Sequence, residues 1–162
     1  MAYKNTLYDW FEYFFWELTK KWRMKRREYN TLSCNFKKLK DELIHFTFDA
    51  NSLGYNRFID LVKNDEIIKY SYKYECKEGF NLPFPEEKYN EFIKKIFIEK
   101  IHKWKKAYAA KEEMLRECDG LLWSLKMEFT NLPEFSSFAY NAFPKNWDKF
   151  NSILKEYFLH FK

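Results

Sequence analysis

One face of the N-terminal segment combines aromatic rings with basic side chains, and this combination suits binding chemistry. If the segment is a helix, with about 100° between successive residues, this face carries Tyr13, Trp16, Lys20, Arg23 and Arg27. Aromatic rings stack on bases, and guanidinium groups form charge-assisted hydrogen bonds to phosphate or carboxylate. We therefore predict that this face binds a protein or nucleoprotein complex, or the phosphate backbone of RNA or DNA.

The positive charge of the chain is concentrated around the same segment. Residues 20–40 contain nine Lys or Arg and a single acid, Glu28, although the net charge of the whole chain is only +5. Clustered charge of one sign attracts partners of the opposite sign. We predict that Arg26, Lys37 and Lys38 extend the binding surface.

The N-terminal segment also allows an alternative interpretation. Its first half is apolar almost all round, as in a helix at the centre of a core. Trp16 would then be buried, and the following Lys and Arg would form a solvated helix end favoured by the helix dipole. The exposure of Trp16 distinguishes the two interpretations.

A second aromatic group lies between Pro133 and Pro144. Its members are Phe135, Phe138, Tyr140 and Phe143. Aromatic side chains often anchor protein interfaces, so we predict a secondary binding segment here. The alternative is that the segment folds back onto the core, where aromatic burial is most stabilising.

A metal-dependent nuclease is the enzymatic alternative. Glu75-Cys76-Lys77 ends an alternating stretch, and Asp60 and Asp65 lie upstream. This order loosely resembles the acid, then acid-x-Lys arrangement of the PD-(D/E)xK nucleases, whose carboxylates hold a divalent cation while the lysine orients the attacking water. The resemblance is confined to these residues, so the first prediction is a protein that is not an enzyme.

The remaining reactive residue types do not form recognisable sites. The histidines, His45, His102 and His160, have no Cys or His at metal-ligand spacing, so we predict structural roles for them and no bound metal or cofactor. Cys76 and Cys118 are predicted to lie on apolar faces, where thiols are inert. With only three glycines in the chain, a glycine-rich phosphate loop is excluded.

Hydrophobic periodicity predicts the elements that would hold these residues. Helices are expected over 6–29, within 30–43, briefly around 58–62, from Pro85 through 118, over 122–129 and from Trp147 onward. Strands are expected at 44–50 and 67–77, paired with each other. The prediction is one domain spanning 1–162, an α+β but predominantly helical fold: a compact bundle of about five helices with a small antiparallel β element.

Composition narrows the class of protein. No apolar run approaches the roughly 18 residues needed to span a bilayer, and the three separate cysteines suit free thiols in the cytoplasm. The leading hypothesis is a non-enzymatic interaction protein. One form of it is a phage or mobile-element inhibitor of a host defence nuclease, similar to an anti-CRISPR. For a phage protein, the expected compartment is the host cytoplasm. A structural protein or homo-oligomer with an aromatic subunit interface is a further alternative.

Overall fold

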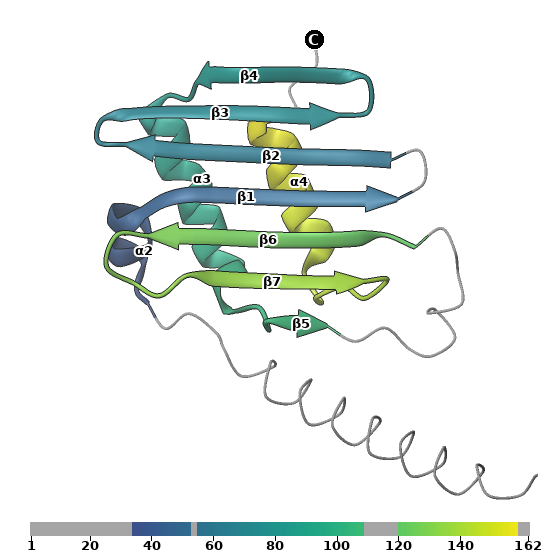
Figure 1. Cartoon of the computed structure of the whole chain (residues 1–162). Coiled ribbons are helices and arrows are strands. Elements are labelled where there is room, and N and C mark those ends of the chain that lie inside the picture. The colour runs from purple at the N-terminus through teal and green to yellow at the C-terminus, as the bar shows by residue number, and fades with distance from the viewer. Residues whose placement is uncertain (1–33, 53–54, 109–119, 159–162) are drawn as a thin grey trace, which may run out of the picture.

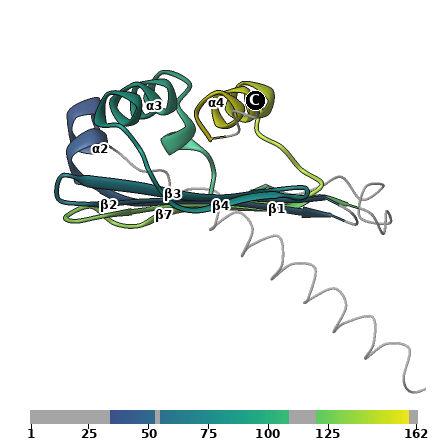
Figure 2. The same cartoon turned by 90° about the horizontal axis from the view of Figure 1, so that it is seen from above.

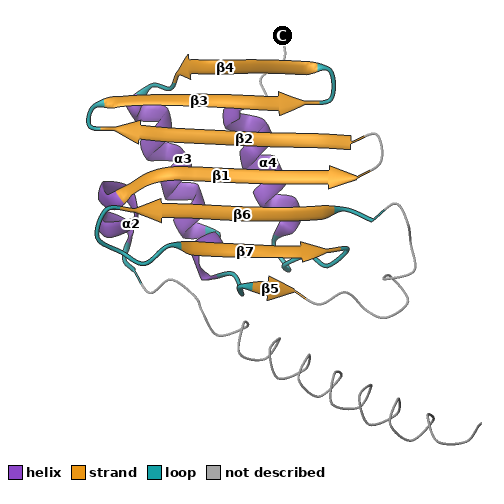
Figure 3. Cartoon of the chain, viewed as in Figure 1, coloured by secondary structure: helices purple, strands orange, loops and turns teal. Residues whose placement is uncertain are grey.

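A seven-stranded mixed β-sheet forms one layer of the molecule (Figure 1), and helices lie against one of its faces (Figure 2). The computed structural model describes residues 34–52, 55–108 and 120–158. Within these ranges the strands are the main element, accompanied by three α-helices and one short 3-10 helix, η1 (Figure 3).

Four strands lie between the first two α-helices of the described chain, and three more lie between the second and the third. They are α2 (Phe36–Glu42), β1 (Leu43–Ser52), β2 (Tyr55–Asn64), β3 (Ile67–Tyr74), β4 (Lys77–Pro83), α3 (Glu86–Ile98), η1 (Ile101–Lys103), β5 (Ala107–Tyr108), β6 (Leu122–Phe129), β7 (Phe135–Tyr140) and α4 (Trp147–Phe158).

The strands lie in the order β4-β3-β2-β1-β6-β7-β5. Strands β1 to β4 form a meander of antiparallel neighbours, β6 pairs with the other side of β1, and β5 runs parallel to β7. Strand β1 is therefore hydrogen-bonded along both edges, which suits its apolar content.

Alternation of side chains explains why β1 is half-buried. Phe46, Phe48 and Ala50 are buried beneath the helices, whereas His45 and Thr47 point to the opposite face. Successive side chains of a strand point to opposite faces, so this strand fixes one apolar and one polar side of the sheet. We call the side away from the described helices the open face (Figure 2).

The core lies between the sheet and the pair α3 and α4. Phe92 of α3 is fully buried, and its ring lies edge-on at 5.1 Å from Phe46 of β1 and at 5.0 Å from Phe158 of α4. Phe150 of α4 lies 5.1 Å from Phe48. Edge-to-face ring pairs add to the free energy of area burial, so this aromatic layer joins both helices to the central strand.

Tyr89 of α3 ties the helix layer to the junction between α2 and β1. Its hydroxyl lies 3.1 Å from the carbonyl oxygens of Lys40 and Leu43, and burial raises the pKa of the phenol well above its usual value. Replacing Tyr89 with Phe removes this donor from a buried position, so we expect the free energy of unfolding to fall by about 1 kcal/mol. Chemical denaturation measures the change, and an unchanged midpoint would contradict it.

No helix within the described ranges combines the length and the hydropathy needed to cross a membrane.

The predicted predominantly helical bundle of about five helices is wrong, because two segments expected to be helical are strands and a third helix is much shorter than expected. Residues 58–62 belong to β2, 122–129 form β6, and the helix that begins after Pro85 ends at Ile98. Short apolar runs fit either periodicity, and pairing with neighbouring strands decides in favour of the sheet. The description of the protein as helical is therefore also wrong.

The predicted pairing of 44–50 with 67–77 is wrong as well, since β2 lies between β1 and β3. The individual strands were expected, and β1 and β3 occupy those segments. The start of α3 after Pro85, a helix within 30–43 and the C-terminal helix from Trp147 are confirmed.

Candidate functional site

The described part of the predicted basic surface begins with helix α2. Asn35 caps this helix, because its side-chain Oδ1 accepts a hydrogen bond of 2.9 Å from the backbone N–H of Lys38. Such a cap fixes the start of the helix and with it the direction of the first turn. Leu39 then points into the core, and Lys37 and Lys38 are exposed.

A second pair of lysines comes from the turn that ends α3. Lys100 adopts a left-handed conformation with φ 55°, and its carbonyl accepts the backbone N–H of Lys103 at 3.0 Å. This turn buries Ile101 and His102 completely and leaves the side chains of Lys100 and Lys103 exposed.

Aromatic packing brings α2 and the turn after α3 together. The ring of Phe36 lies 5.7 Å from that of Phe97, which stacks on His102 at 5.0 Å. Burial raises the pKa of the Cys34 thiol, the positive charges of Lys103 and then Lys38 act in the opposite direction, and the negative charge of Glu42 adds to the rise. Both ammonium groups therefore lie near the same thiol, although their residues are more than sixty positions apart.

We call Lys37, Lys38, Lys100 and Lys103 the basic corner. Like charges held together by the fold create a positive potential that favours an anionic partner. Lys37 and Lys38 were predicted from the sequence, but Lys100 and Lys103 were not, because the segment that contains them was assigned to a long helix.

The other residues predicted for the N-terminal binding face lie outside the described residues. They are Tyr13, Trp16, Lys20, Arg23, Arg26 and Arg27.

Strand β7 divides the predicted aromatic binding segment between two faces. Phe135 is buried in the core, whereas Phe138 is on the open face with 37% of its surface exposed, and Tyr140 is half-buried on that same face. Phe143 follows the strand, and its ring lies 5.0 Å from Trp147. The structure thus brings Phe138 and Tyr140 together and separates them from Phe135.

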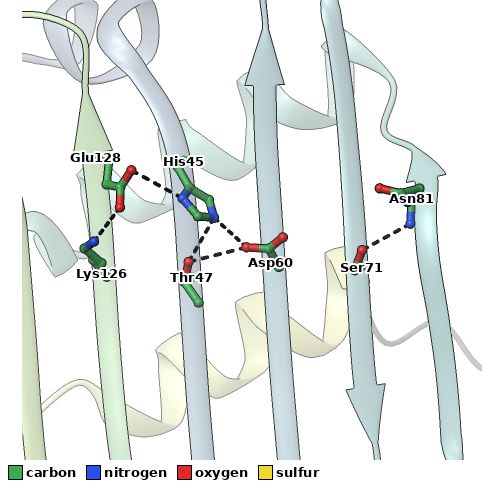
Figure 4. Close-up of polar contacts among 7 residues, drawn as sticks. All are labelled: His45, Thr47, Asp60, Ser71, Asn81, Lys126 and Glu128. Atoms are coloured by element: carbon green, nitrogen blue, oxygen red, sulfur yellow. Dashed lines mark hydrogen bonds and ion pairs between the residues drawn. The ribbon is translucent and has the colours of Figure 1, made fainter.

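The centre of the open face carries a polar network built on three neighbouring strands (Figure 4). His45 of β1 lies between two carboxylates: its Nε2 is 2.5 Å from Oδ1 of Asp60 on β2, and its Nδ1 is 3.4 Å from Oε2 of Glu128 on β6. The hydroxyl of Thr47 is 3.1 Å from the same Nε2. These contacts follow from the register, which places His45 opposite Glu128 and Thr47 opposite Asp60.

The order Thr47, His45, Glu128 superficially suggests a nucleophile, a base and an orienting carboxylate. A base must present an unprotonated nitrogen to the hydroxyl that it activates. The short contact to Asp60 requires Nε2 to carry the proton, because a carboxylate only accepts hydrogen bonds. In the tautomer that fits this contact, Nε2 is a donor to Asp60 and not a base for Thr47, and the network joins polar side chains of three neighbouring strands.

Lys126 completes the network on β6. Its Nζ donates a hydrogen bond to Glu128 and lies 3.2 Å from Oε2 of Glu134. The hydrogen bond from Lys126 is the main cause that lowers the pKa of the Glu128 carboxyl, and the hydrogen bond to His45 acts in the same direction.

Replacing Lys126 with Met is expected to raise the pKa of Glu128. A carboxyl whose pKa is lowered by folding adds stability above its unfolded pKa, and loses it as the pH falls through the lowered folded value. The variant should therefore lose less stability than the wild type on acidification through that range. NMR titration of the glutamate side-chain carboxyls measures the shift; an unchanged Glu128 titration would contradict the pairing.

The residues of the nuclease hypothesis are spread along β3. Asp65 lies in the turn before this eight-residue strand and Glu75 in the turn after it, so about 26 Å separate them at the usual rise per residue. Asp60 of β2 pairs with Ser71 of β3, and Ser71 lies four residues before Glu75. Asp60 and Glu75 are therefore about 13 Å apart along the strand. Within the described ranges no group of three His, Cys, Asp or Glu residues is arranged to hold a metal ion.

Cys76 lies in the turn between β3 and β4 and is exposed. Its predicted position on an apolar face is wrong, because β3 ends at Tyr74 and the alternation does not continue into the turn. Cys118 lies outside the described residues.

The described part of the chain is a sheet-rich α+β fold with a group of exposed lysines at one corner. Comparison of the chain with protein-family models, with curated proteins and with solved structures gives no match.

Proposed function

We propose that this protein is an interaction protein that docks on the phosphate backbone of a nucleic acid, either bare or within a nucleoprotein complex. The observation that supports the proposal is that Lys38 of α2 and Lys103 of the turn after α3 both act on the Cys34 thiol, and that Lys37 and Lys100 are exposed on the same two segments. Exposed ammonium groups neutralise phosphates and release condensed counterions, which drives binding without base recognition.

The basic corner continues the positive stretch of the sequence. Lys37 and Lys38 belong to residues 20–40, the most basic part of the chain. The open face is less suited to phosphate, since its central network contains the carboxylates of Asp60 and Glu128 beside the single ammonium of Lys126. Helix α2 also carries Asp41 and Glu42 at its end, so the preference for the corner rests on its four exposed lysines rather than on a lack of acidic groups.

We propose that the protein acts in the cytoplasm, which for a phage protein is the cytoplasm of the host. One role that such docking serves is the inhibition of a host defence nuclease by occupation of its nucleic-acid surface. Binding alone is sufficient for this role, and no catalytic group is needed.

Fluorescence anisotropy with a labelled DNA duplex and a labelled single-stranded RNA tests the proposal on the full chain. We expect binding with little dependence on base sequence, and an affinity that falls about 100-fold or more between roughly 50 and 200 mM salt. Absence of binding at the lower salt concentration, or binding that does not respond to salt, would contradict it.

A further inference from the structure

A hollow of about 280 Å³ lies on the open face, over strands β2, β3 and β4. Strand β2 contributes Asp60 and Val62, and β3 contributes Ile67, Lys69 and Ser71. We call it the open-face hollow. Its volume is close to the lower end of small-molecule sites, and it shares no residue with the basic corner.

The register of β2 with β3 explains why these side chains meet. Asp60 pairs with Ser71, and Val62 pairs with Lys69. Paired side chains point to the same face of a sheet, and so does Ile67, two residues before Lys69. The hollow therefore has a polar end at Asp60 and Ser71 and an apolar end at Val62 and Ile67.

Hydrogen bonds fix the direction of two groups at the polar end (Figure 4). Oδ1 of Asp60 is 2.5 Å from Nε2 of His45 and accepts from the hydroxyl of Thr47 at 3.4 Å. Its Oδ2 has no partner within the described ranges, and Figure 4 shows it on the side that faces β3. Oγ of Ser71 accepts the backbone N–H of Asn81 at 3.1 Å, and its own proton has no acceptor in the described part of the chain. The hollow thus presents one acceptor and one donor in fixed positions.

Lys69 adds a cation beside this donor. It is exposed, and its ammonium forms no hydrogen bond or ion pair with another described residue. Lys69 and Ser71 lie two residues apart on one face of β3, about 7 Å along the strand. Two donors on one side of the hollow suit the two oxygens of a carboxylate.

The opposite end of the hollow suits an aliphatic group. Val62 is half-buried, and 62% of Ile67 is exposed. Asn64 pairs with Ile67 and is exposed at the same end, where water satisfies its amide. Covering the exposed isoleucine with an apolar group removes apolar surface from water and favours binding.

We propose that the open-face hollow binds a free amino acid with an aliphatic side chain, such as leucine. Its carboxylate accepts hydrogen bonds from Lys69 and Ser71, and its ammonium donates to Oδ2 of Asp60. Its side chain covers Val62 and Ile67. His45 already contacts Oδ1, so Asp60 serves the ligand as an acceptor of fixed direction and not as a second uncompensated charge.

The pairing of Lys69 with Oδ2 of Asp60 selects an amino acid over simpler molecules. A carboxylic acid without the amino group leaves Oδ2 without a donor, whereas an amine without the carboxylate meets the like charge of Lys69. Only a molecule that carries both groups satisfies the two sides of the hollow.

NMR titration of the isotope-labelled full chain with L-leucine tests this site in the absence of nucleic acid. Isocaproate lacks the ammonium of leucine, isoamylamine lacks the carboxylate, and glycine lacks the aliphatic body. We expect saturable shifts of the Val62 and Ile67 methyl signals and tighter binding of leucine than of any of the three analogues. Absence of saturation, or leucine affinity no better than that of an analogue, would overturn the assignment.

Two variants of equal charge change separate the hollow from the rest of the open face. Lys69→Gln should weaken leucine binding about threefold, the size of an exposed ion pair, and should not weaken binding of isoamylamine, which has no carboxylate. Lys73→Gln, on the same face of β3 but outside the hollow, should leave leucine affinity unchanged. Equal effects of the two variants on leucine would overturn the proposal.

Discussion

Replacing Phe92 with alanine is expected to lower the free energy of unfolding by about 4 kcal/mol, as for other buried Phe-to-Ala changes. The side chain is completely buried, and its ring contacts both the central strand through Phe46 and helix α4 through Phe158. The change removes apolar burial and leaves a cavity that three packed elements cannot close without moving apart.

Denaturant unfolding followed by circular dichroism measures this loss. Ile98→Ala on the same helix provides the control, because 58% of that residue is exposed, and its effect should stay within about 0.5 kcal/mol. If the two variants lose similar stability, α3 does not pack on the sheet as described.

Reversing the charge of Lys38 and Lys103 together is expected to weaken nucleic-acid binding by at least about tenfold at low salt. The two residues come from separate elements, and both act on the Cys34 thiol. Each substitution removes an attractive contact to phosphate and adds a repulsive one. Both side chains are exposed, so thermal stability should change little.

The double variant Lys69→Glu, Lys73→Glu serves as a matched control. Both lysines are exposed on strand β3, and the register places their side chains on the open face. The change in net charge is the same as at the corner. Equal losses of affinity in the two double variants would show that binding depends on net charge and not on the basic corner.

Part of the fold was predictable because its periodicity was unambiguous. In α4, Phe150, Leu154 and Tyr157 recur at helical spacing, and all are buried. Strand β3 alternates apolar and polar residues over most of its length. Only the helical period fits α4, and only the two-residue period of a strand fits β3. The predicted helix and the predicted strand are both confirmed.

Strand β6 shows why other elements were misassigned. Leu122, Leu125 and Phe129 fit helical spacing, and the prediction followed them. Trp123, Leu125, Met127 and Phe129 also alternate, and these are the residues that the sheet buries. A strand paired on both edges gains hydrogen bonds from distant segments, and local periodicity carries no information about them.

The candidate sites depend still more on tertiary structure. Lys37 and Lys38 were predicted from local charge density, whereas Lys103 acts on the same thiol as Lys38 only because the fold brings the end of α3 to α2, where Phe36 packs on Phe97. The polar network around His45 depends in the same way on the register of β1 with β2 and β6. Spacing in the sequence indicated neither arrangement.

The dependence of nucleic-acid affinity on salt, compared between the wild type and a Lys38→Ala, Lys103→Ala variant, tests the proposed docking most directly. If both lysines neutralise phosphates of a DNA duplex, the slope of the logarithm of affinity against the logarithm of salt concentration should decrease in magnitude by about 1.8. The Lys69→Ala, Lys73→Ala variant should keep the wild-type slope. Identical slopes for all three proteins would contradict docking through the basic corner.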